Sequence, residues 1–135
     1  SGAFSDGEEI YKQTLTDALV IFAKSILKSG YILTFGSHPT FQELFFEISK
    51  LIYPENCKEH LKMYISKWFE DKYLYSKEYY NESTTFNETE KNNSLSKSLT
   101  TMRKHMIQRK EVSALICMGG KIKKNKADEG IREEH

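Results

Sequence analysis

Short apolar runs that alternate with helical segments constrain the fold of this chain more than any other feature of its sequence. The runs at residues 31–35, 61–69 and 112–118 are short and mostly apolar, as is typical of buried strands. Apolar residues at helical spacing fill the intervals and predict helices over residues 8–29, 40–53 and 94–109. Strands that are apolar along their length are covered on both faces, as in parallel sheets. The alternation therefore predicts an α/β fold, with a mostly parallel sheet flanked by helices.

Local signals mark the ends of the predicted helices. Ser5-Asp6-Gly7-Glu8 and Thr40-Phe41-Gln42-Glu43 have the form of capping boxes, whose side chains satisfy free backbone donors at the start of a helix. Gly30 predicts a left-handed stop at the end of the first helix.

Residues 70–93 interrupt the alternation, because Tyr, Asn, Glu, Ser and Thr dominate there without clear periodicity. A loop of this length in a compact domain is usually a lid or an insertion. We therefore predict a flexible insertion that begins at the ligand-binding edge of the sheet. Its three N-x-S/T sequons are most simply accidents of an Asn-rich stretch.

The length of 135 residues suits one compact domain, and we expect residues 1–135 to form it. The chain starts without Met and ends, at His135, on what resembles the first turn of a helix. We expect a segment of a longer protein, with one strand upstream of Ser1 and others beyond His135.

Charge and cysteine content disfavour several classes of protein. Twenty basic and 19 acidic residues give a net charge of +1, so bulk charge favours neither nucleic acid nor a membrane surface as a partner. No apolar run approaches the roughly 18 residues needed to span a bilayer. Cys57 and Cys117 form no C-x-x-C pair, which favours a reduced, cytoplasmic protein. Cys57-x-x-His60 supplies only two of the four ligands usual for a metal, so we expect no metal.

Small and hydroxyl residues follow the predicted strands, at the edge where open parallel sheets bind their ligands. Residues 1–2, 36–40, 66–69 and 119–121 reach this edge. Free backbone N–H groups and close backbone approach suit a phosphate or a ribose. Any one of these glycines is more simply a turn residue, but three such strand ends together favour a nucleotide-like ligand.

Several side chains at this edge leave two alternatives open. His38 is either a base or ligand-stacking imidazole, or a helix-entry residue that hydrogen-bonds the loop. Trp68 and Phe69 could stack on a base, although core packing is the commoner role for such residues. Arg103 is either a phosphate ligand or a solvated residue of its helix, and the lysines of residues 121–126 are more often a surface run.

Four motifs together resemble a SLOG domain, of the LOG-like branch attached to sirtuin-like and TIR domains that is called STALD. They are Gly36-Ser37-His38-Pro39-Thr40, Met102-Arg103-x-x-Met106, Gly119-Gly120-Lys121 and Gly130-Ile131-x-x-Glu134. Ser1-Gly2-Ala3 is similar to the loop after the first strand of that branch. The resemblance covers nearly the whole chain outside residues 70–93 and implies a Rossmann-like fold.

The resemblance also implies a sensor in bacterial anti-phage defence, as in the Thoeris system. There, a TIR enzyme makes a cyclic ADP-ribose isomer, and the SLOG domain binds it and activates a fused NAD-consuming domain. Arg103, Lys121 and Glu134 match positions that contact the phosphates and ribose of the signal. The full predicted ligand-binding set is Ser1, Gly2, Gly36, Ser37, His38, Thr40, Arg103, Gly119, Gly120, Lys121 and Glu134. We expect an ADP-ribose-type nucleotide as ligand, no cofactor, and a fused or partner TIR or sirtuin-like effector.

The alternative is an enzyme, a LOG-like nucleotide N-glycosidase (phosphoribohydrolase) with Glu134 and Arg103 catalytic. Enzymatic LOG proteins carry P-G-G-x-G-T-x-x-E, whereas Met118-Gly119-Gly120-Lys121 lacks the Pro and the x-G-T. This departure favours binding without turnover. An interaction domain with a vestigial pocket is a third class.

We also expect a homo-oligomer. Ile10, Thr14, Val20 and Ile21 lie off the main apolar stripe of the first helix. They face either a second copy of the chain or an element missing from this segment.

Overall fold

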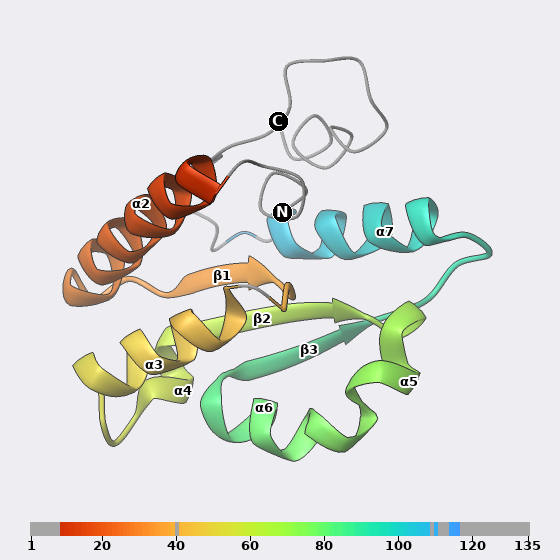
Figure 1. Ribbon diagram of the computed structural model, residues 1–135. Helices are drawn as coiled ribbons and strands as arrows, with labels where there is room; N and C mark the ends of the chain where they lie inside the picture. Colours follow the sequence, from red (N-terminus) through yellow and green to blue (C-terminus); the bar gives the residue numbers. More distant parts are fainter. Residues whose placement is uncertain (1–8, 40, 109, 111–113, 117–135) are drawn as a thin grey trace.

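The computed structural model describes residues 9–39, 41–108, 110 and 114–116. Figure 1 shows three strands side by side in one sheet, in the order β1-β2-β3. The strands are β1 (Leu33–Gly36), β2 (Leu61–Ser66) and β3 (Thr85–Thr89). Both pairings are parallel. This arrangement confirms the predicted α/β class and is consistent with a Rossmann-like fold.

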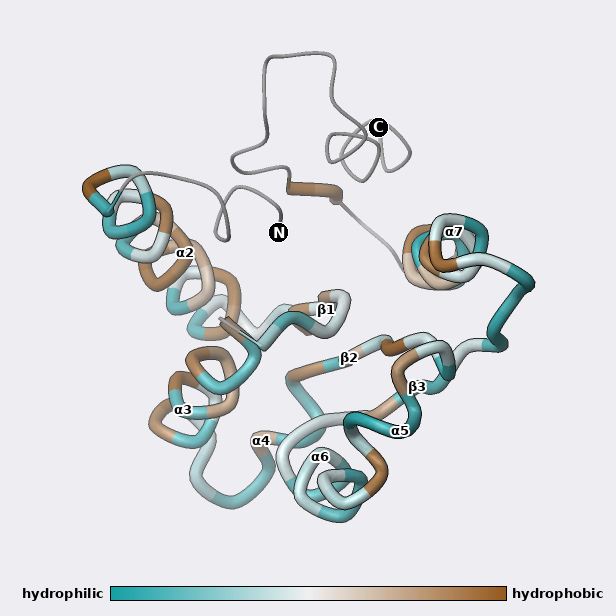
Figure 2. Tube along the Cα trace, turned by 45° about the vertical axis from the view of Figure 1, so that its right-hand side comes forward, coloured by the Kyte–Doolittle hydropathy of each residue, from teal (hydrophilic) through white to brown (hydrophobic). Residues whose placement is uncertain are grey.

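Helices lie on both faces of this sheet. They are α2 (Glu9–Lys28), α3 (Gln42–Ile52), α4 (Cys57–His60), α5 (Glu70–Tyr73), α6 (Lys77–Ser83) and α7 (Leu95–Ile107). Two short 3-10 turns, η1 (Lys67–Phe69) and η2 (Leu74–Ser76), flank α5. Figure 2 shows α7 on one face of the sheet and α3, α4 and α6 on the other, with α2 beside β1 and α3. None of the helices in the described part of the chain is long and apolar enough to cross a membrane.

The core has two parts because the side chains of β2 alternate between the two faces of the sheet. Met63 and Ile65 join a large cluster with Phe46 of α3 and Leu27 of α2, and all four are buried. Tyr64 points the other way and packs with Met102 and Met106 of α7. β2 is thus covered on both faces, as its apolar sequence predicts.

Gly30 ends α2 as predicted. Its φ of 84° is in the left-handed region that glycine tolerates. The Gly30 N–H donates to the Leu27 carbonyl at 3.0 Å, and the Tyr31 N–H donates to the Ile26 carbonyl at 3.2 Å, which is the Schellman pattern. At the start of α3 the N-cap is Phe41, without a side-chain cap. Thr40 and residues 5–8 lie outside the described residues.

The prediction of an insertion without core structure at residues 70–93 is wrong. This segment forms α5, η2, α6 and β3, and its Tyr73 and Tyr80 are buried in the main core. Its strand is mostly polar, with the sequence TFNET; Phe86 packs on the core, and threonine hydroxyls at both ends of the strand bond to β2. Thr84 Oγ1 donates to the Leu61 carbonyl at 3.0 Å, and Thr89 Oγ1 donates to the Ile65 carbonyl at 3.4 Å.

Two other predicted strands also need correction. The run at residues 61–69 is a strand only to Ser66, after which the chain turns into η1. In the run at residues 112–118, residues 114–116 have no regular structure and are exposed, and the remainder lies outside the described residues. The third strand of the described sheet is therefore β3, from the segment predicted to be a loop.

Tyr80→Ala tests whether the 70–93 segment belongs to the core. Tyr80 packs against Phe46 and Phe86, and truncation of a buried aromatic residue costs about 3–5 kcal/mol. Tyr75 is 95% exposed in the same segment, so Tyr75→Ala should change the free energy of unfolding by no more than about 0.5 kcal/mol. Urea unfolding of both variants measures the difference, and equal stabilities would show that α6 does not contribute to the core.

Candidate functional site

The ends of the three strands meet at the carboxyl edge of the sheet. Ser66 is in register with Thr89, and Gly36 is in register with Tyr64. The Ser37 N–H donates to the Tyr64 carbonyl at 2.8 Å, so the ladder continues one residue beyond β1. Residues that follow β1, β2 and β3 therefore lie side by side at the edge where parallel sheets bind ligands.

Gly36 gives α7 close access to the end of β1. A Cβ on Gly36 would lie 3.0 Å from the Met102 methyl carbon and 4.0 Å from the Met106 sulfur. The glycine is therefore explained by helix packing alone, whether or not a ligand also approaches it. Arg103 follows the buried Met102 on α7 and is itself half-buried.

Ser37 is held by a chain of hydrogen bonds that crosses to the 70–93 segment. Ser37 Oγ donates to Gln42 Oε1 at 3.0 Å, and Gln42 Nε2 donates to the Tyr80 hydroxyl at 3.0 Å. Gln42 is buried, so its amide depends on these partners. Sequence analysis missed Gln42 and Tyr80, because they are 38 residues apart and their pairing exists only in the fold.

His38 packs at the entry to α3. Its carbonyl accepts the Phe41 N–H at 3.3 Å and the Gln42 N–H at 3.1 Å. Its ring stacks on Phe41, with centroids 5.0 Å apart and planes at 6°. Burial lowers the pKa of the imidazole, which favours its neutral form. These contacts support the helix-entry alternative for His38, and its role toward a ligand stays a prediction.

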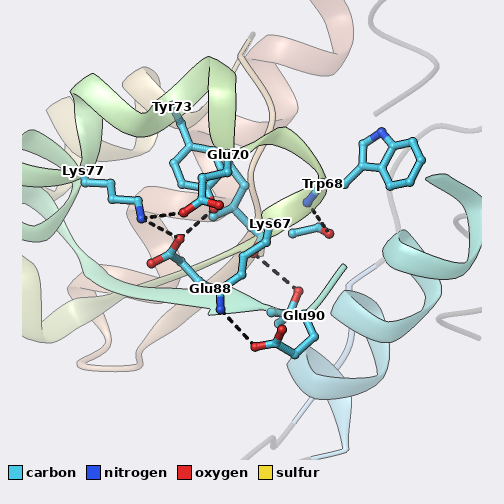
Figure 3. A network of polar contacts seen from close by, with 10 residues as sticks. Lys67, Trp68, Glu70, Tyr73, Lys77, Glu88 and Glu90 are labelled. Atoms are coloured by element: carbon cyan, nitrogen blue, oxygen red, sulfur yellow. Dashed lines mark hydrogen bonds and ion pairs between the residues drawn. The ribbon is translucent and has the colours of Figure 1, made fainter. Parts of the chain in front are cut away.

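Ion pairs order the residues after β2 and β3 (Figure 3). Lys67 Nζ lies 3.0 Å from Glu90 Oε1, and Lys77 Nζ lies 3.0 Å from Glu88 and 3.2 Å from Glu70. The Tyr73 hydroxyl also donates to Glu88 at 2.8 Å. Burial acts to raise the pKa of Glu88, but the hydrogen bonds from Lys77 and Tyr73 outweigh it and the pKa is lowered. The carboxylates at this end of the sheet are thus matched by lysines.

An open hollow of about 360 Å³ lies where β3 and α7 meet the end of β2. It is lined by Tyr64, Asn87, Glu88, Thr89, Glu90 and His105. Hydroxyl, amide and carboxylate groups of this kind suit the hydroxyls of a sugar. The sequence alone does not predict this hollow, because β3 has no apolar pattern. Without β3, nothing indicates that Asn87 and Thr89 lie at the edge of the sheet.

The described residues contain no cluster of His, Cys, Asp or Glu that could hold a metal ion. Cys57 is buried at the start of α4. His60 stacks on Tyr53, with centroids 3.5 Å apart and planes at 5°. Both side chains of the Cys57-x-x-His60 motif therefore have packing roles.

The predicted site residues divide into two groups. Gly36, Ser37 and His38 lie together at the end of β1, and α7 brings Arg103 to the same end of the sheet, because its Met102 packs beside Gly36. The others lie outside the described residues: Ser1, Gly2, Thr40, Gly119, Gly120, Lys121 and Glu134.

Comparison with known proteins gives one family match. A family model with the description "SLOG cluster3 family" matches residues 9–135. No curated protein and no solved structure gives a significant match.

The lowered pKa of His38 predicts a pH dependence of stability. The unfolded chain binds a proton near the ordinary histidine pKa of about 6.5, whereas the folded chain resists it, so stability falls as the pH drops below that value. The free energy of unfolding of His38→Gln should therefore fall less than that of the wild type between about pH 7.5 and about pH 5.5, one pH unit either side of the ordinary histidine pKa. Urea unfolding at both pH values measures the difference. His105→Gln, at an exposed position on α7, is the matched control. A wild-type pH dependence in His38→Gln would contradict the prediction.

Proposed function

The chain belongs to the SLOG cluster3 family, and from that premise we propose that it is a nucleotide-sensing module. Its ligand is an NAD-derived signal, a cyclic ADP-ribose isomer or a related ADP-ribose nucleotide. Binding activates a fused or partner TIR or sirtuin-like effector in bacterial anti-phage defence, as in the STALD branch that the motifs resemble.

One observation carries the proposal: α7, with Arg103, lies against the end of β1 at the carboxyl edge of the sheet. Met102 packs so closely on Gly36 that a Cβ there would lie 3.0 Å from the Met102 methyl carbon. A guanidinium offers a planar fork of donors for a phosphate. Ser37 follows β1 directly, and its hydroxyl oxygen, which donates its proton to Gln42, can accept from a ribose hydroxyl at the same strand end.

The hollow beside β3 supports the sugar end of such a ligand. Asn87, Thr89 and Glu90 line it and can donate to or accept from ribose hydroxyls. Lys67 lies at the adjacent strand end in an exposed pair with Glu90. Exposed pairs are weak, so Lys67 can exchange this carboxylate for a phosphate at little cost.

Binding without turnover is the favoured chemistry, because the P-G-G-x-G-T sequence of the LOG enzymes is not present. Incubation with AMP and with cyclic ADP-ribose isomers, followed by chromatography, tests this point. Intact nucleotides are expected. Release of adenine would instead establish the LOG-like N-glycosidase.

Arg103→Ala should weaken binding of the nucleotide roughly ten- to a hundredfold, since loss of a charge-assisted hydrogen bond costs about 1.5–3 kcal/mol. Calorimetric titration with a panel of NAD-derived nucleotides measures the affinity. Lys104→Ala removes an exposed cation from the next position of α7 and should leave affinity within about twofold, a change of about 0.4 kcal/mol. Equal affinities of the wild type and a folded Arg103→Ala variant would remove Arg103 from the site.

The sensor is further proposed to be a homo-oligomer. Supporting this, Ile10 and Ile21 of α2 are 81% and 65% exposed, and Phe22 is also exposed. Val20, by contrast, packs against the core.

Ile21→Glu places a charge on this exposed apolar face and should shift the full-length protein toward monomers, because a charge at an apolar interface is costly to bury. Mass photometry with and without nucleotide measures the shift. Lys24→Glu, another exposed position on α2, is the control. A wild type that is monomeric in both states would refute the oligomer.

A further inference from the structure

We infer that Trp68 is the platform on which the base of the bound nucleotide stacks. The inference rests on the proposed function, and it names a side chain that the family motifs do not include. It follows from where Trp68 lies, how its backbone is held, and which way its indole ring points.

Trp68 lies at the middle of the ligand-binding edge. It follows β2, the strand that has β1 on one side and β3 on the other. The loop with Ser37 and His38 leaves the edge on one side of it, and Thr89 and Glu90 leave on the other. A ring at this position is within the edge where parallel sheets bind ligands.

The residues on either side of Trp68 are fixed by separate contacts. The Trp68 N–H donates to Ser66 Oγ at 3.2 Å, and Ser66 is fully buried. Lys67 pairs with Glu90 across the strand ends at 3.0 Å. Phe69 packs against the main core, and the Lys72 ammonium lies 5.8 Å from the centre of its ring.

The indole ring of Trp68 makes none of these contacts. Trp68 is 40% exposed, although Phe69 beside it packs on the core. Figure 3 shows the indole turned away from the ion pairs of Lys67, Lys77 and Glu88. A large aromatic surface on a held backbone can bind a flat ligand with little further loss of conformational entropy.

Stacking on a base is the interaction that matches these features. Every base has a π face, so stacking is strong and tolerant of base identity. Lys67 next to Trp68 places a positive charge near the phosphates of the same ligand. The structure therefore separates the two aromatic residues after β2: Phe69 packs against the core, and Trp68 leaves its indole exposed after β2.

The test uses the fact that Trp68 is the single tryptophan of the chain. Saturation of the full chain with ADP-ribose should change its tryptophan fluorescence, with binding measured separately by calorimetry. Trp68→Ala should weaken ADP-ribose binding roughly 5- to 150-fold, the range for loss of one base–aromatic stack. Trp68→Phe should retain most of the affinity. Binding of ribose 5-phosphate, which has no base, should be the same in Trp68→Ala and the wild type.

Tyr75→Ala is the matched control, since it removes another exposed aromatic side chain, from η2 and not from the residues directly after a strand. It should bind ADP-ribose like the wild type. If the wild type binds ADP-ribose while its fluorescence and the affinity of Trp68→Ala are unchanged, stacking is overturned and the nucleotide sensor stands. Equal losses for ADP-ribose and ribose 5-phosphate would also overturn stacking, because they would show a general disturbance of the edge. A wild type that binds no NAD-derived nucleotide refutes the proposed function itself.

Discussion

Burial of β2 on both faces is the constraint on which the other elements depend. Met63 and Ile65 face the layer of α3 and α2, and Tyr64 faces α7. If apolar and polar residues alternated along the strand, one of the two helical layers would have no apolar surface of β2 to cover. The same strand pairs with β1 and with β3, so one segment of six residues determines the order of the sheet and the position of both helical layers.

The sequence predicts best where apolar residues form a pattern. α2 and α7 follow from apolar residues at helical spacing and β2 from a short apolar run, and the end of α2 follows from Gly30, whose positive φ few other residues adopt. β3 could not be predicted in this way. It is an edge of the described sheet, and Phe86 is the one apolar residue of its sequence that packs on the core. Backbone pairing and threonine hydroxyls also hold the strand, and neither leaves an apolar pattern. The apolar residues 114–116 illustrate the converse, since their composition suits a strand and yet they are exposed without regular structure.

The candidate site was predictable as an edge but not as a set of contacts. The rule that ligands bind at the carboxyl ends of parallel strands located Gly36, Ser37 and His38 correctly at that edge. It could not show that the Ser37 hydroxyl donates to Gln42, or that Gln42 in turn depends on Tyr80. Each of these long-range polar pairs involves only two residues, so it leaves no periodic pattern in the sequence from which it could be predicted. The loop after β1 is thereby tied to the segment that was predicted to be a flexible insertion.

The contact between Gly36 and α7 sets how closely the helix that carries Arg103 approaches the end of β1. The space beside the glycine is filled by the side chains of Met102 and Met106, both buried. A Cβ at position 36 would lie 3.0 Å from the Met102 methyl carbon, so a larger residue there would first displace that side chain. A methionine side chain has three rotatable bonds and adapts to small changes in its surroundings. A change at the end of β1 would therefore reach the helix that carries Arg103 from its buried side, away from its charged surface.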